Sequence, residues 1–408
     1  MRRFFTPSTI VSVVIIAAVT AIVAAANWRD ARLSGLASTR PMSMGTRGAN
    51  TGRADLARRI VELRAAAVRR PDDIGAAVTL ADALVRQTRV TGNSGLAIEA
   101  EAALRRALTN DPSNYDANRQ LGSLLLSQHR FREAVAVGKK NRDARPYDPI
   151  SYGIIGDGLL ELGEYDQAFE TFDKMMALRP SSASYARVAY ARELQGNVNG
   201  AIEAMKLAAD ATPPDDPEAL AWHRAQVGDL YLRLGKTHEA ETEYIAASHA
   251  FPGHPFAMIG YARLLAARGE PGSALVLLQE LAKTAPTPDL AARTGDLLAA
   301  LGRRDEAERQ YALAEAGWRV DAPEPKNLAR FLADHERRIP EAVAIAEKAA
   351  LERHDIFTED ALAWAYFKAG RVADARGAIA QALRTGTRDA DIRAHAEAIA
   401  AAPGQAGR

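Results

Sequence analysis

Cysteine is missing from this sequence, and aromatic residues are scarce. The 408 residues include no Cys and only 6% Phe, Trp and Tyr. The lack of Cys excludes disulfide bonds, thiolate catalysis, Cys-bound zinc and a lipidated N-terminal Cys. It does not fix the compartment, because a long helical array buries enough apolar surface without covalent links. Few aromatics in an Ala-rich chain favour an all-helical fold.

The signatures of common enzyme sites are also absent. The sequence holds no glycine-rich phosphate loop, no G-x-S-x-G and no H-E-x-x-H. The glycines stand singly, and the eight His are scattered. We therefore expect no catalytic residue, no cofactor, no metal site and no small-molecule substrate. A helical active site would need a constellation of reactive side chains, which the sequence does not show, so we do not expect an enzyme.

Positive charge is concentrated at the N-terminus. Residues 1–54 contain seven Arg and one Asp, so they carry +6, and the rest of the chain carries −5 of the net +1. The acidic body shows no basic stripe of the kind that grips phosphates. Nucleic acid is therefore not an expected partner.

A hydrophobic segment follows the initial Met1-Arg2-Arg3. The run from Phe4 to Asn27 is uncharged. Its length suits a transmembrane helix that anchors the chain. Its basic start and the small residues Ala24-Ala25-Ala26 also suit a cleaved signal peptide, although the apolar stretch is long for one. The sequence thus predicts a hydrophobic N-terminal helix at 1–27, either signal or anchor, and a membrane contact through it.

The segments at the two ends of the predicted body are polar. Residues 28–54 hold Gly, Ser, Thr and Arg without a helical apolar period, which indicates a flexible basic linker. Residues 402–408 are expected to be a disordered tail. Because the signal-like site favours export, we expect the body to be anchored or exported, with its location periplasmic or extracellular.

Prolines and small residues reveal an internal period of 34 residues. Pro112, Pro146 and Pro180 are 34 apart, as are Pro252 and Pro286. Nine repeats can be aligned, each with two helices. The second helix of every repeat has Ala at one position: Ala100, Ala134, Ala168, Ala201, Ala240, Ala274, Ala307, Ala342 and Ala375. The first helix has Gly or Ala: Ala81, Gly122, Gly156, Ala189, Gly228, Ala262, Gly295 and Ala363, with Arg330 in the eighth repeat.

These residues resemble the tetratricopeptide repeat (TPR) family. In one repeat, Tyr152 and Gly156 are followed at the family spacing by Gly163, Tyr165, Ala168, Phe172 and Pro180. The resemblance implies an all-α, right-handed superhelical solenoid of about nine helix-turn-helix repeats over residues 55–401. Residues 389–401 would form half a further repeat. The N-terminal segment suggests a bacterial-type, membrane-anchored or exported member.

The resemblance also implies a binding groove. In this family the first helices line a concave groove, and side chains at fixed positions of each repeat point into it. Carried over to this sequence, those positions give one candidate partner-binding set: Asp157, Tyr190, Trp222, Asp229 and Arg233. Aromatic rings beside charged groups suit a protein or peptide partner.

Two functional hypotheses follow, and both depend on binding. The first is a non-enzymatic protein–protein interaction scaffold at the bacterial envelope. The alternative is a regulatory or assembly subunit of an envelope transport, secretion or polysaccharide-export system. Proteins with this repeat fold perform many different functions, so the repeats alone do not separate the two hypotheses.

Overall fold

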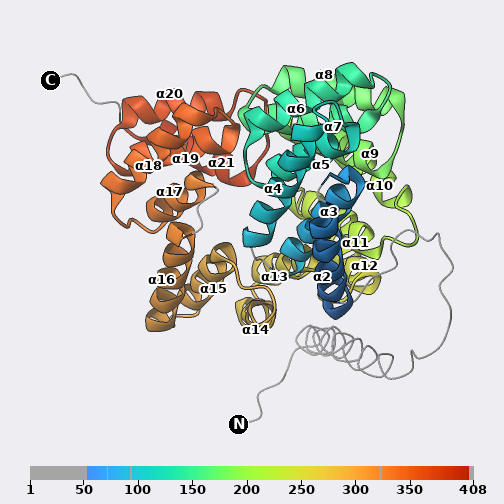
Figure 1. Cartoon of the computed structure of the whole chain (residues 1–408). Helices are drawn as coiled ribbons and strands as arrows, with labels where there is room; N and C mark the ends of the chain where they lie inside the picture. Colours follow the sequence, from blue (N-terminus) through green and yellow to red (C-terminus); the bar gives the residue numbers. More distant parts are fainter. Residues whose placement is uncertain (1–52, 71, 92–93, 321–323, 404–408) are drawn as a thin grey trace, which may run out of the picture. The chain divides into compact units, whose positions relative to one another are not determined.

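The computed structural model describes residues 53–70, 72–91, 94–320 and 324–403. These residues form twenty helices and no strand (Figure 1). The predicted all-α solenoid is thereby confirmed. Among the helices described, none is both long enough and apolar enough to span a membrane.

The predicted terminal segments fall mostly outside this description. The hydrophobic segment at 1–27 and the linker up to residue 52 lie outside the described residues, as does the tail from residue 404. Helix α2 begins at Arg53, two residues before the predicted start of the repeats at residue 55.

The described residues belong to two compact units. The N-terminal unit comprises residues 53–180 together with Glu352–Asp355. Its helices are α2 (Arg53–Arg69), α3 (Ile74–Thr91), α4 (Ser94–Asn110), α5 (Tyr115–Ser127), α6 (Phe131–Ala144), α7 (Pro149–Leu162) and α8 (Tyr165–Leu178).

The C-terminal unit comprises Ser181–Leu351 and residues 356–403. Its helices are α9 (Ser182–Leu194), α10 (Val198–Asp210), α11 (Pro217–Arg233), α12 (Thr237–Ala250), α13 (Pro255–Ala267), α14 (Pro271–Ala282), α15 (Pro288–Ala300), α16 (Arg304–Val320), α17 (Pro325–Asp334), α18 (Ile339–Glu352), α19 (Ile356–Lys368), α20 (Val372–Ala382) and α21 (Ala390–Ala401).

The helices pair as the repeat predicts. Nine successive pairs run from α3/α4 to α19/α20, with α2 before the first pair and α21 after the last. The two helices pack against each other in eight of these pairs, and α17 of the remaining pair packs against α19. Local sequence sets the helix ends. Before α7, the Asp148 side chain accepts the Ile150 N–H and Pro149 opens the helix; Gly163 ends it with φ 84. This is the expected chemistry of an N-cap and of a left-handed C-terminal residue.

The two helices of a repeat cross at small residues. All nine predicted second-helix alanines are at most 2% exposed. In α7, a Cβ on Gly156 would overlap the ring of Phe172 from α8, so the glycine permits the close approach. The same overlap relates Gly228 to Tyr244 and Gly295 to Tyr311. In these three repeats, a glycine of the first helix therefore packs against an aromatic ring sixteen residues later, in the second helix.

The eighth repeat corrects the predicted register. Ala329, which is fully buried, takes the crossing position, and Arg330 is the residue after it. In most other repeats a residue of positive φ, usually Gly, stands seven places after the crossing; here Glu336 does, with φ 51. Arg338 (φ 46) follows in a turn that is one residue longer. The sequence misplaces the crossing because this turn is one residue longer than those of the other repeats, and no glycine marks the extra residue.

Candidate binding face

One face of the C-terminal unit is built by the residues that directly follow the crossing residue of each first helix. Together with Arg233 of α11, we call their side chains the first-helix face: Tyr190, Asp229, Arg263, Asp296, Arg330 and Trp364. Neighbouring first helices pack against one another within this unit, as α11 does on α13 and α17 on α19. The side chains on successive helices can therefore interact.

Asp229 is held from two sides. The Tyr244 hydroxyl donates to Asp229 Oδ1 over 2.5 Å, and the Arg263 guanidinium donates to the same oxygen. Burial, reinforced by the charge of Asp229, raises the pKa of Tyr244, so the phenol keeps its proton. The ring that fills the crossing beside Gly228 thus also positions a carboxylate of the face.

Asp296 repeats this arrangement two repeats later, on α15. It accepts from the Tyr311 hydroxyl over 3.0 Å, and His335 Nε2 lies 2.9 Å from its Oδ1. His335 Nδ1 is 2.9 Å from the Phe331 carbonyl oxygen. Burial alone would lower the pKa of His335, but these hydrogen bonds outweigh burial and raise it. The imidazole is therefore biased toward its charged form.

Arg233 bridges two carboxylates that are far apart in sequence. Its guanidinium lies 3.0 Å from Glu193 of α9 and 3.0 Å from Asp389, the N-cap of α21. Burial is the largest cause raising the pKa of Glu193; Arg233 opposes the shift, and Asp229 and Asp389 reinforce it. Arg233 is thus engaged within the chain.

Helix α21 makes two more contacts with the face. Arg330 Nη2 lies 2.6 Å from Asp391 Oδ2. The His395 ring stacks on Trp364 with centroids 4.0 Å apart and an interplanar angle of 12°. His395 Nδ1 is also 2.9 Å from Asp360 Oδ1 on α19. The last helix therefore touches three different first helices of this unit.

The five predicted site residues divide between the two units. Asp157 lies on α7 of the N-terminal unit, whereas Tyr190, Trp222, Asp229 and Arg233 lie on α9 and α11 of the C-terminal unit. Trp222 is half-buried and packs against the core of α9, α10 and α11. It is therefore part of the packing as well as a candidate contact.

Sequence reasoning missed four polar residues beside this face, namely Glu193, Asp389, Asp391 and His395. Three of them belong to α21, whose docking pairs residues as many as 156 positions apart. The Tyr–Asp pairs were discoverable, because an Asp follows Gly228 and Gly295 and a Tyr follows each Asp at the same spacing. In the described part of the chain, no group of three or more His, Asp or Glu is placed to hold a metal ion.

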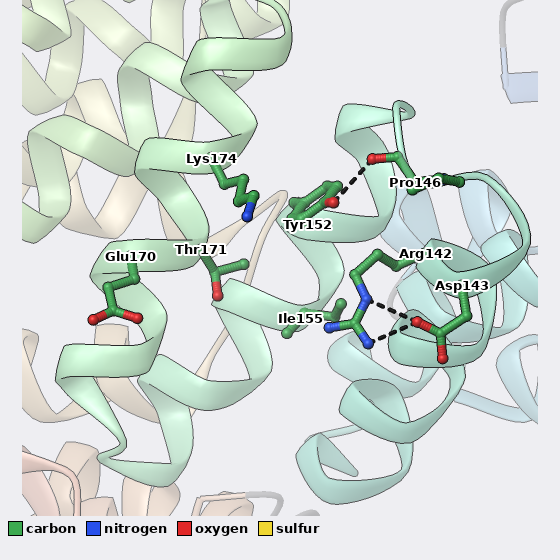
Figure 2. A pocket seen from close by; sticks show the side chains of 8 residues that line it. All are labelled: Arg142, Asp143, Pro146, Tyr152, Ile155, Glu170, Thr171 and Lys174. Carbon is green, nitrogen blue, oxygen red and sulfur yellow. Dashed lines mark hydrogen bonds and ion pairs between the residues drawn. The ribbon is translucent and has the colours of Figure 1, made fainter.

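A pocket of about 550 Å³ lies elsewhere, within the N-terminal unit (Figure 2). It is lined by Arg142, Asp143, Pro146, Tyr152, Ile155, Glu170, Thr171 and Lys174. The Tyr152 hydroxyl donates to the Pro146 carbonyl over 2.9 Å, and Arg142 pairs with Asp143 at 2.7 Å. Its charges are mixed, and none of the five predicted site residues lines it. This pocket supplies control positions for tests of the first-helix face.

Two segments of the chain match a known repeat family. Residues 94–149 and 228–291 match the tetratricopeptide repeat family. These two segments lie in different units, and they span both helices of a repeat in each. No curated protein matches the sequence.

Solved structures share the fold at low identity. The human IFIT1 dimer with PPP-AAAA is 15% identical, with 82% of this chain and 79% of that chain covered and a TM-score of 0.53. In the crystal structure of the APC/C hetero-tetramer Cut9-Hcn1, a chain is 14% identical, with 86% of this chain covered and a TM-score of 0.51. The present chain spans 60% of the length of that one. Likeness at this identity concerns the fold alone.

Proposed function

Starting from a chain built of tetratricopeptide repeats, a scaffold fold typical of protein–protein interaction, we propose that it is a non-enzymatic scaffold whose first-helix face binds a partner protein or peptide. The binding set expected from the sequence divides accordingly: Tyr190, Asp229 and Arg233 lie on this face, Trp222 lies on the same helix as Asp229, and Asp157 belongs to the N-terminal unit.

The observation that carries the proposal is the charge pattern of the face. Asp229, Arg263, Asp296 and Arg330 alternate in sign on α11, α13, α15 and α17. The ring of Tyr190 lies on α9, the first helix of the preceding repeat, and the ring of Trp222 lies on α11, where the series begins. A peptide with side chains of both charges and apolar groups would find complementary partners along it.

We place this scaffold at a bacterial envelope, held there or exported by residues 1–27, with the repeats outside the cytoplasm. The support is the uncharged run after Met1-Arg2-Arg3 and the small residues before Asn27. An alternative with the same support is a regulatory or assembly subunit of an envelope transport, secretion or polysaccharide-export system.

Binding is tested with a partner captured by the full chain and then purified. Trp222→Ala should weaken its affinity most, by more than about 2 kcal/mol, because a ring in a desolvated interface carries more than an exposed charge. Asp229→Ala should mainly reduce the salt dependence of binding. Lys174→Ala, in the pocket of the N-terminal unit, is the matched control.

Melting temperature must be measured beside affinity, because Trp222 packs against the core. If all five residues are replaced, the fold stays intact and affinity is unchanged, the partner docks elsewhere and the proposal fails.

Location is tested by deleting residues 1–27. The shortened chain should fold and no longer reach the membrane or the envelope. Sequencing the mature N-terminus separates the two interpretations: a start at Asn27 means a cleaved signal, and an intact start in the membrane fraction means an anchor. An intact full chain that stays in the cytoplasm contradicts both.

A further inference from the structure

Helix α21 is the half repeat at the end of the array, and it lies beside α19 and α20 (Figure 1). One side of it is apolar: Ile392 and Ile399 are at most 1% exposed. The N-terminal end of the helix is polar, and it brings two carboxylates and an imidazole to the first-helix face. An ordinary cap would need only the apolar side, so the polar end calls for its own explanation.

The polar contacts of α21 are complementary in charge and in shape. Arg233 faces Asp389 at 3.0 Å, Arg330 faces Asp391 at 2.6 Å, and the Trp364 indole stacks on His395. Burial would raise the pKa of Asp391, but the charge and hydrogen bond of Arg330 outweigh it and lower that pKa. The face thus supplies two guanidiniums and an indole to an acidic helix.

The turn before α21 is fitted to the same unit. The Gly386 carbonyl lies so close to Gly196, in the turn between α9 and α10, that a Cβ on Gly196 would overlap it. Asp389 then caps α21 by accepting the N–H groups of Asp391 and Ile392. This capping fixes the carboxylate where Arg233 can reach it.

We propose that α21 is an internal occupant of the first-helix face, and that a partner binds there through an acidic helix of the same kind. Such a helix carries two carboxylates at its N-terminal end and an aromatic or imidazole ring four residues after the second, as Asp391 and His395 do. Partner binding then requires α21 to leave. The inference rests on the proposed function, that the face binds protein, and names the chemistry of the partner.

Two of the contacts that hold the polar end are ion pairs with solvent-exposed members. The side chains of Arg233, Arg330 and Asp391 are 32%, 33% and 62% exposed, whereas Asp389 is 14% exposed and His395, which contacts Asp360, is 9% exposed. Ion pairs at such exposure contribute little each, because solvent and salt screen them. Helices at the end of an array open locally before the array unfolds. Release of α21 therefore leaves the nine repeats in place.

The test uses a fluorescent peptide of residues 387–403, which is α21 with its cap, added to the full chain. Ile392→Asp places a charge at a fully buried position and should release the internal helix. Ala394→Asp, on the exposed side of the same helix, is the matched control. The peptide should bind Ile392→Asp at least about tenfold more tightly than the wild type or the control, because the competing internal helix is gone.

Recognition by charge is tested on the opened chain. Arg330→Glu added to Ile392→Asp should abolish peptide binding, and a peptide with Asp389→Asn and Asp391→Asn should bind at least about tenfold more weakly. Should Ile392→Asp fail to fold, the full chain with Asp389→Asn and Asp391→Asn replaces it. This variant removes the α21 carboxylates that pair with Arg233 and Arg330 but keeps Ile392, and the wild-type peptide should bind it more tightly than the wild-type chain.

Equal peptide affinity for the opened and wild-type chains, or affinity that Arg330→Glu leaves unchanged, overturns the inference. The proposed function has a separate readout. If the captured partner still depends on Trp222 while the peptide does not bind, the protein-binding face stands and the role of α21 falls.

Discussion

Repeats with a glycine crossing differ from repeats with an alanine crossing. In three of the four repeats whose first helix has glycine at the crossing, the residue sixteen places later is aromatic: Gly156 with Phe172, Gly228 with Tyr244 and Gly295 with Tyr311. The fourth, Gly122, has Gly138 at that place, and Ile154 of the next repeat contacts both glycines. In three repeats with alanine at the crossing, the residue is an unbranched or branched aliphatic-type side chain: Ala189 with Met205, Ala262 with Leu278 and Ala363 with Ile379. All six of the larger side chains are at most 7% exposed. In these six repeats the crossing residue and the residue sixteen places later therefore fill one space together: a glycine leaves room for an aromatic ring, and an alanine leaves room for a smaller side chain.

The difference extends to the first-helix face. A Tyr at a glycine crossing is long enough to carry its hydroxyl to the Asp that follows the glycine, as Tyr244 does for Asp229 and Tyr311 for Asp296. Met205, Leu278 and Ile379 have no such group. A Tyr at a glycine crossing thus ties a face carboxylate to the core, which Phe172 and the aliphatic side chains cannot do.

The largest effect is expected for Tyr244→Ala. It removes a ring that is 1% exposed and leaves a cavity between Gly228 and Gly260, at a cost of about 3–5 kcal/mol. Met205→Ala, at the equivalent position of an alanine crossing, should cost less because no face carboxylate loses its donor. Thermal melts of both variants followed by circular dichroism compare them. A larger loss for Met205→Ala would contradict the distinction.

The shared volume predicts that the crossing pairs are coupled. Gly228→Ala should destabilise by about 1–3 kcal/mol, because its Cβ meets the Tyr244 ring. Ala189→Gly should cost only about 0.5–1 kcal/mol. In the double variant Gly228→Ala with Tyr244→Leu, which copies Ala262 with Leu278, the cost should be clearly less than the sum of the single costs. Additive losses would mean that the two positions do not share space.

Tyr244→Phe isolates the hydroxyl. The ring still fills the crossing, but Asp229 loses one hydrogen bond and keeps Arg263, so a loss of about 1 kcal/mol is expected. Phe172, which is buried at the equivalent position of α8, shows that Phe fits a glycine crossing, so the ring should stay in place. A loss as large as that of Tyr244→Ala would show that the ring itself had moved.

The smallest effect is expected at His335, and it depends on pH. Folding raises the pKa of His335 above 6.5, so its contribution is fully present below pH 6.5 and is lost as pH rises through the raised value. His335→Gln should therefore lower the melting temperature more at pH 6 than at pH 8.5. The difference should stay below about 1 kcal/mol, because the Asp296 side chain is 55% exposed. A larger loss at pH 8.5 would reverse the sign and contradict the assignment.

Periodic positions could be predicted from the sequence, and single departures could not. The second-helix alanines follow the 34-residue period, because every repeat needs the same close crossing. The eighth crossing was misplaced by one residue, because the turn there is one residue longer and its residues of positive φ, Glu336 and Arg338, are not glycines. A non-glycine residue in that conformation leaves no signal in the sequence.

The candidate site shows a similar limit. The family positions identified Asp229 and Arg233, but not the partners that hold them within the chain. Asp389 is 156 residues from Arg233, and only the docking of α21 brings them together. Trp222 follows the family spacing and yet packs against a core. The five-residue binding set remains a prediction. Repeat spacing predicts which way a side chain points, but it does not predict which other residues of the chain contact that side chain.

Hydrogen–deuterium exchange of the full chain, with and without the captured partner, tests the central claim most directly. A partner on the first-helix face should slow amide exchange in α9 and α11 and speed it in α21, while α6 and α8 beside the pocket stay unchanged. Protection confined to α6 and α8, with α9, α11 and α21 unaffected, would contradict the account.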